Sequence, residues 1–221
     1  MTGCLQHDNN SFTIYRVFEN LVDGANLSIY VLLKRLELWR STHDEKFPTT
    51  IYWQVDGGSE NANRFCLAIC ELLIARTPIK EIIFTRLPVG HTHEDIDGKM
   101  IIQKKIISSL KQGQFGKIWK AVRNKQLLSA NAYERELREI YSKQKFDIVD
   151  VFCIPDYTSF FSKCLDPKFQ GWAREERTQL QWRFDKPPTK DADFFPHGVR
   201  IQYRAFSSNE VVEIFKIGNN C

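Results

Sequence analysis

The spacing of hydrophobic and polar residues changes several times along the first half of the chain. Residues 2–7 and 11–20 are short runs rich in Thr, Ile, Tyr and Phe, separated by Asp-Asn-Asn. Such runs around a turn sequence predict a β-hairpin. Residues 26–40 predict a helix, which either Asn26 or Ser28 would cap. Its hydrophobic residues recur at helical spacing: Leu27, Val31, Leu32, Leu36 and Trp39.

Strands and helices alternate in the residues that follow. The β-branched and aromatic run 49–55 predicts a buried strand. A helical pattern from residue 60 ends before Pro78, and residues 80–89 predict another strand. Residues 92–111 predict a helix with acidic residues at its start and lysines later. The order strand, strand, helix, strand, helix, strand, helix favours an α/β fold.

The pattern is looser beyond Gln112. Residues 116–124 and 130–144 predict helices, whereas 147–155 and 210–217 predict strands. We place a domain boundary near residues 113–116, which gives a core at 1–112 and an α+β extension at 113–221. The extension is expected to combine a helical part with a β-rich part whose core contains Trp172, Trp182 and Phe184.

Composition narrows the class of protein only slightly. The 221 residues are 43% hydrophobic, enough for one large domain or a domain with an appendage, and the net charge of +4 does not by itself require a nucleic-acid partner. The six cysteines include no CxxC pair, so we expect reduced, mostly buried thiols in an intracellular protein. No run is long and apolar enough to span a bilayer, and no apolar leader is present at the start of the chain.

Asp56 is the first candidate for chemistry. It follows the predicted strand 49–55 and opens the sequence Asp-Gly-Gly-Ser. That sequence is ordinary turn material, because Gly accepts positive φ and Asp can bond the backbone that follows it. A carboxylate at the C-terminal end of a strand is also where open α/β sheets place ligands and catalytic groups. The residues alone leave both interpretations open.

A second cluster lies at Gly90–Asp97, with the sequence GHTHEDID. Thr92 could cap the next helix, with Glu94 and Asp95 in its first turn. Helix capping does not account for Asp97 or for the two histidines, His91 and His93. Carboxylates and imidazoles clustered at a strand-to-helix junction suit a divalent cation, and hard oxygen ligands favour Mg²⁺ or Mn²⁺.

The third feature is charge of one sign. Between Gly98 and Tyr133 no acidic residue occurs, and Phe115 and Trp119 lie among the basic residues. A solvated helix face would explain this run. Basic residues directly after an acidic cluster would also suit a site that holds a phosphate backbone while metal-bound carboxylates cleave it. The basic residues are Lys99, Lys104, Lys105, Lys111, Lys117, Lys120, Arg123 and Lys125.

The element order and the two acidic positions resemble the retroviral-integrase superfamily, which has the RNase H-like fold of DDE/D transposases. The strings DGGSENANR and LPVGHTHEDID resemble more closely an uncharacterised transposon-derived domain of eukaryotic genomes with the pattern VGHTHxDxD. The resemblance covers about residues 3–110. It implies a mixed sheet flanked by helices, in which the hairpin corresponds to the second and third strands. The first strand, which carries the first catalytic acid in that superfamily, is then missing from this chain.

The resemblance also implies roles for individual residues. Asp56 takes the place of the second catalytic acid and Asp97 that of the third, with Asp95 and Glu94 as substitutes. Mg²⁺ or Mn²⁺ would be held by Asp56 and Asp97 with His91 or His93, and DNA would be gripped by lysines. The basic positions assigned to DNA are Lys99, Lys104, Lys105, Lys111 and Lys117.

Three functions remain open at this point. The first is a DNA-binding transposase or integrase, intracellular and nuclear, that cleaves phosphodiesters and transfers strands, and that could form a homo-oligomer. The second is an inactive transposon relic that binds nucleic acid or protein. The third is a small-molecule α/β enzyme, which the absence of a Gly-rich phosphate loop and of a GxSxG elbow disfavours.

Overall fold

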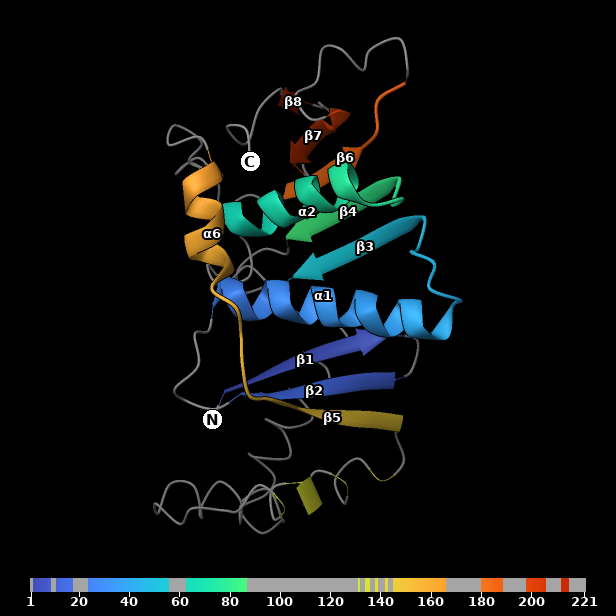
Figure 1. The fold of residues 1–221 in the computed structure, drawn as a ribbon, viewed down its shortest axis with the longest axis vertical. Coiled ribbons are helices and arrows are strands. Elements are labelled where there is room, and N and C mark those ends of the chain that lie inside the picture. Colours follow the sequence, from blue (N-terminus) through green and yellow to red (C-terminus); the bar gives the residue numbers. More distant parts are fainter. Residues whose placement is uncertain are drawn as a thin grey trace. The chain divides into compact units, whose positions relative to one another are not determined.

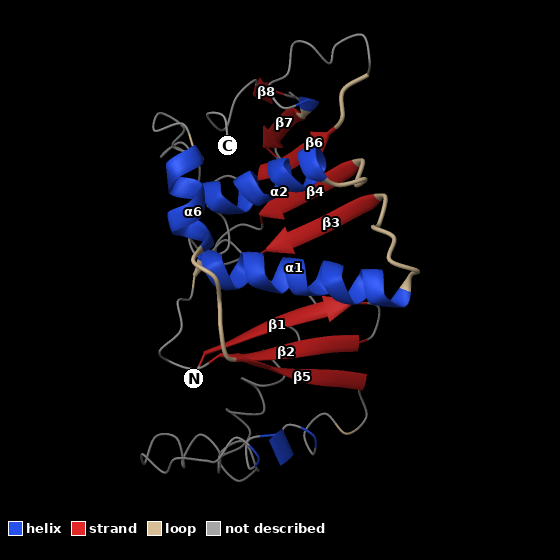
Figure 2. Cartoon of the chain, in the orientation of Figure 1, coloured by secondary structure: helices blue, strands red, loops and turns tan. Residues whose placement is uncertain are grey.

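The computed structural model divides the chain into two compact units. One comprises Met1–Glu19 and His93–Phe152, and the other Asn20–Thr92 and Cys153–Cys221. We call them unit 1 and unit 2 and describe each by itself (Figures 1 and 2). The structure describes residues 2–8, 11–17, 24–55, 63–86, 131, 134–135, 138, 142, 145–165, 180–188, 198–205 and 212–214.

Unit 1 contains a three-stranded mixed sheet in the order β1-β2-β5. Strands β1 (Thr2–Asp8) and β2 (Ser11–Val17) are antiparallel, which confirms the predicted hairpin. Strand β5 (Lys145–Val151) pairs with β2 in parallel and confirms the core of the strand predicted at 147–155.

Buried Arg16 on β2 meets Asp150, its register partner on β5, through two hydrogen bonds. Nη2 donates to Oδ2 at 2.6 Å, and Nε donates to Oδ1. The two partners lie 134 residues apart in the sequence, so this bidentate ion pair joins distant segments of unit 1.

Unit 2 contains a five-stranded mixed sheet in the order β3-β4-β6-β7-β8. Strands β3 and β4 are parallel, and each later strand is antiparallel to its neighbour. The predicted strands 49–55, 80–89 and 210–217 are confirmed in their central parts. The expected burial of the strand at 49–55 is wrong, because none of its residues is fully buried and Tyr52 is 77% exposed. The strands are β3 (Thr50–Val55), β4 (Glu81–Arg86), β6 (Leu180–Asp185), β7 (Arg200–Ala205) and β8 (Val212–Ile214).

Three helices of unit 2 pack with this sheet. They are α1 (Ala25–Thr42), α2 (Arg64–Arg76) and α6 (Tyr157–Cys164). Helix α2 lies over β4 and β6 and contacts both other helices, as Figure 1 shows. The predicted helices at 26–40 and from residue 60 are therefore confirmed. The described helices and strands confirm a mixed α/β fold.

Alternation along the strands gives the sheet one apolar face, which packs against the helices. Ile82 and Phe84 on β4 are 0% exposed, as is Phe184 on β6. Trp182 is also buried and stacks on Tyr203 of β7 at a centroid distance of 4.9 Å. The expected burial of Trp182 and Phe184 is confirmed, and Trp172 lies outside the described residues. These residues belong to the hydrophobic core of unit 2.

The start of α1 differs from the prediction. Gly24, not Asn26 or Ser28, occupies the N-cap, with a φ of 66° that glycine adopts without strain, and no side chain caps the helix. Asn26 and Ser28 are buried inside the first turn. Asn26 instead reaches another helix, because its Oδ1 accepts a hydrogen bond from the backbone N–H of Thr158 in α6 at 2.9 Å.

The cysteines fit the prediction in part. Cys66 and Cys70 on α2 are buried free thiols, and burial raises the pKa of Cys66 to about 12 and that of Cys70 well above its usual value. Cys153 is free but exposed. Cys164, at the end of α6, is disulfide-bonded, so the expectation of reduced thiols is wrong for this residue.

Candidate functional site

The carboxyl ends of β3 and β4 lie side by side in the sheet. The two strands are parallel, and Val55, the last residue of β3, is the register partner of Arg86, the last residue of β4. Asp56 follows Val55 directly in the chain, and the segment that leads to Gly90–Asp97 follows Arg86. Both predicted acidic segments therefore leave the sheet from neighbouring positions on one edge, the edge where open α/β sheets bind ligands.

Side-chain packing and a helix cap stabilise the segments next to the carboxyl ends of β3 and β4. The Trp53 ring on β3 packs against Phe84 on β4, with 4.9 Å between ring centroids and a tilt of 60°. Asn63, the next described residue after β3, caps α2. The Asn63 Oδ1 accepts hydrogen bonds from the backbone N–H groups of Phe65 and Cys66 at 2.9 and 3.2 Å.

The predicted site residues themselves lie outside the described residues, so the structure neither brings them together nor separates them. Within the described ranges, no group of three or more His, Cys, Asp or Glu side chains could hold a metal ion. The residues outside those ranges are Asp56, His91, His93, Glu94, Asp95, Asp97, Lys99, Lys104, Lys105, Lys111 and Lys117.

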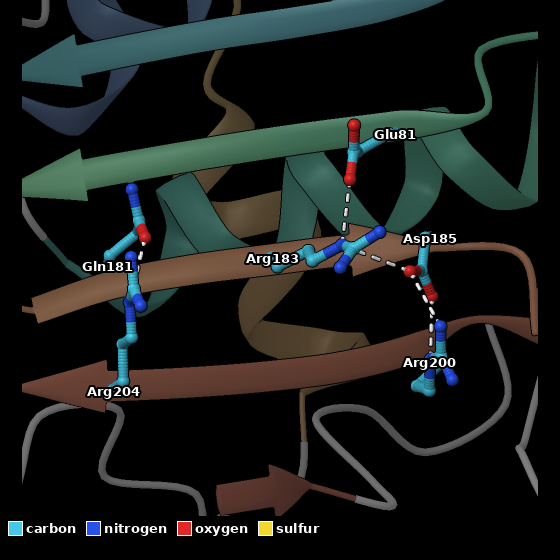
Figure 3. Close-up of polar contacts among 6 residues, drawn as sticks. All are labelled: Glu81, Gln181, Arg183, Asp185, Arg200 and Arg204. Atoms are coloured by element: carbon cyan, nitrogen blue, oxygen red, sulfur yellow. Dashed lines mark hydrogen bonds and ion pairs between the residues drawn. The ribbon is translucent and has the colours of Figure 1, made fainter. Parts of the chain in front are cut away.

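A network of charged side chains lies on the face of the unit 2 sheet that points away from α2 (Figure 3). Arg183 of β6 is central: its Nε lies 2.7 Å from Oε1 of Glu81 and 3.2 Å from Oδ2 of Asp185. Asp185 also accepts two hydrogen bonds of 2.9 Å from Arg200 on β7. The bidentate pair gives both carboxyl oxygens of Asp185 a hydrogen-bond partner and explains how this polar side chain can be buried.

The same face carries a polar pair nearer the carboxyl ends of β3 and β4. Arg204 of β7 donates from Nε to Oε1 of Gln181 on β6 at 3.1 Å, and both are visible in Figure 3. Thr85 of β4 is the register partner of Gln181. These residues were not among the functional candidates predicted from the sequence. The sequence signal that could have revealed them is the alternation of polar and apolar residues in QWRFD and RIQYR. This alternation lies in a segment rich in aromatic residues and prolines, which obscures it.

A family model described as "Domain of unknown function (DUF7869)" matches residues 1–192. The chain belongs to this family. No curated protein and no solved structure matched the chain. The residues that match DUF7869 include every strand of the two sheets except β7 and β8 of unit 2. The family description assigns no activity to these residues.

In the part of this DUF7869 chain that the structure describes, no helix could span a membrane. Helices α1, α2 and α6 are too short or too polar to cross a bilayer.

Proposed function

We propose that the chain descends from a DDE/D-type transposase or integrase with an RNase H-like fold. The intact ancestor would bind DNA, cleave a phosphodiester with Mg²⁺ or Mn²⁺ and transfer the strand. The proposal rests on the strings that resemble transposon-derived domains and on one structural observation. Val55 and Arg86 are register partners, so the segments that carry Asp56 and Asp97 start from adjacent strand ends.

The proposed chemistry divides among three kinds of residue. Asp56 and Asp97 would hold the metal, with Asp95 or Glu94 as alternatives to Asp97 and with His91 or His93 as a further ligand. The metal would polarise the scissile phosphate and activate water or a 3′ hydroxyl. The lysines at 99, 104, 105, 111 and 117 would contact the DNA backbone, which gives binding that weakens with salt.

The alternative is a relic that binds without cleaving. In the superfamily that the sequence resembles, the first acid sits on a strand before the hairpin, and a protein without that strand would lack this acid. Carboxylates that bridge two metal ions support in-line displacement, so the loss of one acid would weaken or abolish cleavage while leaving lysine contacts in place. The same DNA-binding surface serves both alternatives.

A nicking assay separates them. End-labelled DNA is incubated with the 221-residue chain and Mg²⁺ or Mn²⁺, and nicks are resolved on a denaturing gel. We expect wild type to nick and Asp56→Asn and Asp97→Asn each to lose at least about 100-fold in rate, because removing a metal ligand removes several kcal/mol of transition-state stabilisation. The matched control is Asp44→Asn, at an exposed position on the loop after α1.

The outcomes have distinct meanings. Equal nicking by wild type and by Asp56→Asn would refute the catalytic role of Asp56. DNA binding that weakens with salt, without nicking by wild type, would favour the relic. Binding that does not respond to salt would contradict the lysine contacts.

A further inference from the structure

The disulfide at the end of α6 has a partner that elimination narrows to two residues. The chain has six cysteines. Cys164 is disulfide-bonded, and three others are free thiols, namely Cys66, Cys70 and Cys153. The partner of Cys164 is therefore Cys4 or Cys221, whose side chains both lie outside the described residues.

The division into compact units favours Cys221. A disulfide requires the two Cα atoms to lie about 4.4–6.8 Å apart, so its partners are close neighbours in space. Cys164 and Cys221 belong to unit 2, whereas Cys4 lies on β1 of unit 1. A bond from Cys164 to Cys221 is contained within one compact unit, as a contact between close neighbours should be.

We propose that Cys164 and Cys221 form a redox-sensitive disulfide that ties the segment after β8 to the end of α6. Each thiol loses one proton when the S–S bond forms. The two electrons pass to a small-molecule disulfide such as glutathione disulfide, whose S–S bond breaks to give two thiols. Excess reduced glutathione reverses the reaction, so the bond closes under oxidising conditions and opens under reducing ones.

Exposure separates Cys164 from the thiols of α2. Cys66 and Cys70 are 0% exposed, and burial raises the pKa of both, which keeps them as unreactive thiols. Cys164 is half-buried, and the preceding Ser162 and Lys163 are exposed. A small thiol or disulfide can therefore reach the Cys164 sulfur, which is what reversible exchange requires.

Closing this bond would restrict the unfolded chain. The loop between Cys164 and Cys221 contains β6, β7 and β8 of the unit 2 sheet, and β8 has only three residues. Phe161 and Leu165, on either side of Cys164, are buried in the core that α6 shares with α2. The bond anchors the end of that loop to a packed helix, so oxidation should stabilise unit 2.

Peptide mapping identifies the partner. The whole chain is oxidised in a glutathione buffer, blocked with iodoacetamide, digested with trypsin and analysed by mass spectrometry without reduction. We expect the peptide CLDPK, which begins at Cys164, to be linked to IGNNC, which ends at Cys221. A link from CLDPK to the peptide of residues 1–16 would identify Cys4 and overturn the proposal, and so would a CLDPK peptide that stays unlinked.

Thermal unfolding measures what the bond does. We expect reduction to lower the Tm of wild type by about 5–15 °C and to leave the Tm of Cys221→Ser unchanged. The matched control Cys153→Ser removes an exposed free thiol and should keep the full response to reduction. Equal Tm values for oxidised and reduced wild type, a response that persists in Cys221→Ser, or a link that excess reduced glutathione fails to open would each overturn the proposal. None of these results depends on DNA binding or cleavage.

Discussion

At the scale of single residues, Glu71 is the most perturbed carboxyl group in the described chain. It lies on α2, the helix that is buried against the sheet and both other helices. Desolvation raises the pKa of Glu71 to about 7 from an ordinary value of 4.5. The folded protein thus binds a proton at this side chain over a pH range in which the unfolded chain has released it.

The stability of the fold should therefore fall as the pH rises from about 4.5 to 7. Over this range the folded state holds more protons than the unfolded state, and the total effect is on the order of 3 kcal/mol. Glu71→Gln cannot ionise, so this part of the pH dependence should disappear and the variant should resist urea better than wild type at pH 8. Urea unfolding at pH 5 and pH 8 measures the free energy of unfolding of wild type and variant. The exposed change Glu37→Gln on α1 is the control, and identical pH profiles for wild type and Glu71→Gln would contradict the assignment.

Asp156 shows the opposite shift. It caps α6, and hydrogen bonds from the hydroxyl and backbone N–H of Ser159 and from the hydroxyl of Thr158 lower the pKa of Asp156 to about 2. Its stabilising effect is present above the unfolded pKa of 3.8 and is lost as the pH falls toward 2. Glu71 and Asp156 therefore affect stability over different pH ranges.

At the scale of elements, one side chain joins α1 to the start of α6. Asn26 is 1% exposed, accepts from the Thr158 backbone N–H at 2.9 Å and donates to the Thr158 hydroxyl at 3.3 Å. The first N–H groups of a helix have no partner within the helix, so Asn26 satisfies a partly buried donor at the start of α6.

Removing this link should destabilise unit 2 measurably. We expect Asn26→Ala to lower the free energy of unfolding by about 1–3 kcal/mol, because it leaves the Thr158 N–H without its acceptor. Thr158→Val removes only the hydroxyl, so its effect should be smaller. Denaturant unfolding of both variants measures which loses more free energy of unfolding. A larger loss for Thr158→Val would show that the hydroxyl, rather than the hydrogen bond to the backbone N–H, stabilises the contact between α1 and α6.

Elements with a clear period could be predicted from the sequence. The β-branched and aromatic run of β3 and the helical patterns of α1 and α2 predicted these elements to within a few residues of their ends. Helix α6 was missed because its eight residues span about two turns, too few to establish a helical period. Asp156 was its one local signal, as an N-cap residue after a proline.

Sheet partners could not be predicted from local patterns. Strand β6 pairs with β4, and β5 pairs with β2, although the intervening segments are long. Local sequence gives a strand's period but not which distant strand will share its hydrogen bonds. For the candidate site, the sequence placed Asp56 directly after a strand, and the parallel register of β3 and β4 adds the adjacency of the two strand ends.

At the scale of the whole molecule, both sheets depend on the second half of the chain. Each sheet is completed by a strand from the second half of the chain, so truncation after Gln112 would remove β5 from one and β6–β8 from the other. Both units therefore depend on residues beyond the segment that resembles transposases, and functional tests should use all 221 residues.

The central proposal is that Asp56 and Asp97 share a divalent cation. Mn²⁺ binding to the whole chain, followed by electron paramagnetic resonance of the free ion, tests it without requiring catalysis. We predict saturable binding that Mg²⁺ displaces, weakened at least about tenfold by Asp56→Asn and by Asp97→Asn but unchanged by Asp44→Asn. Wild type and all three variants binding Mn²⁺ equally, or none binding it, would contradict the claim.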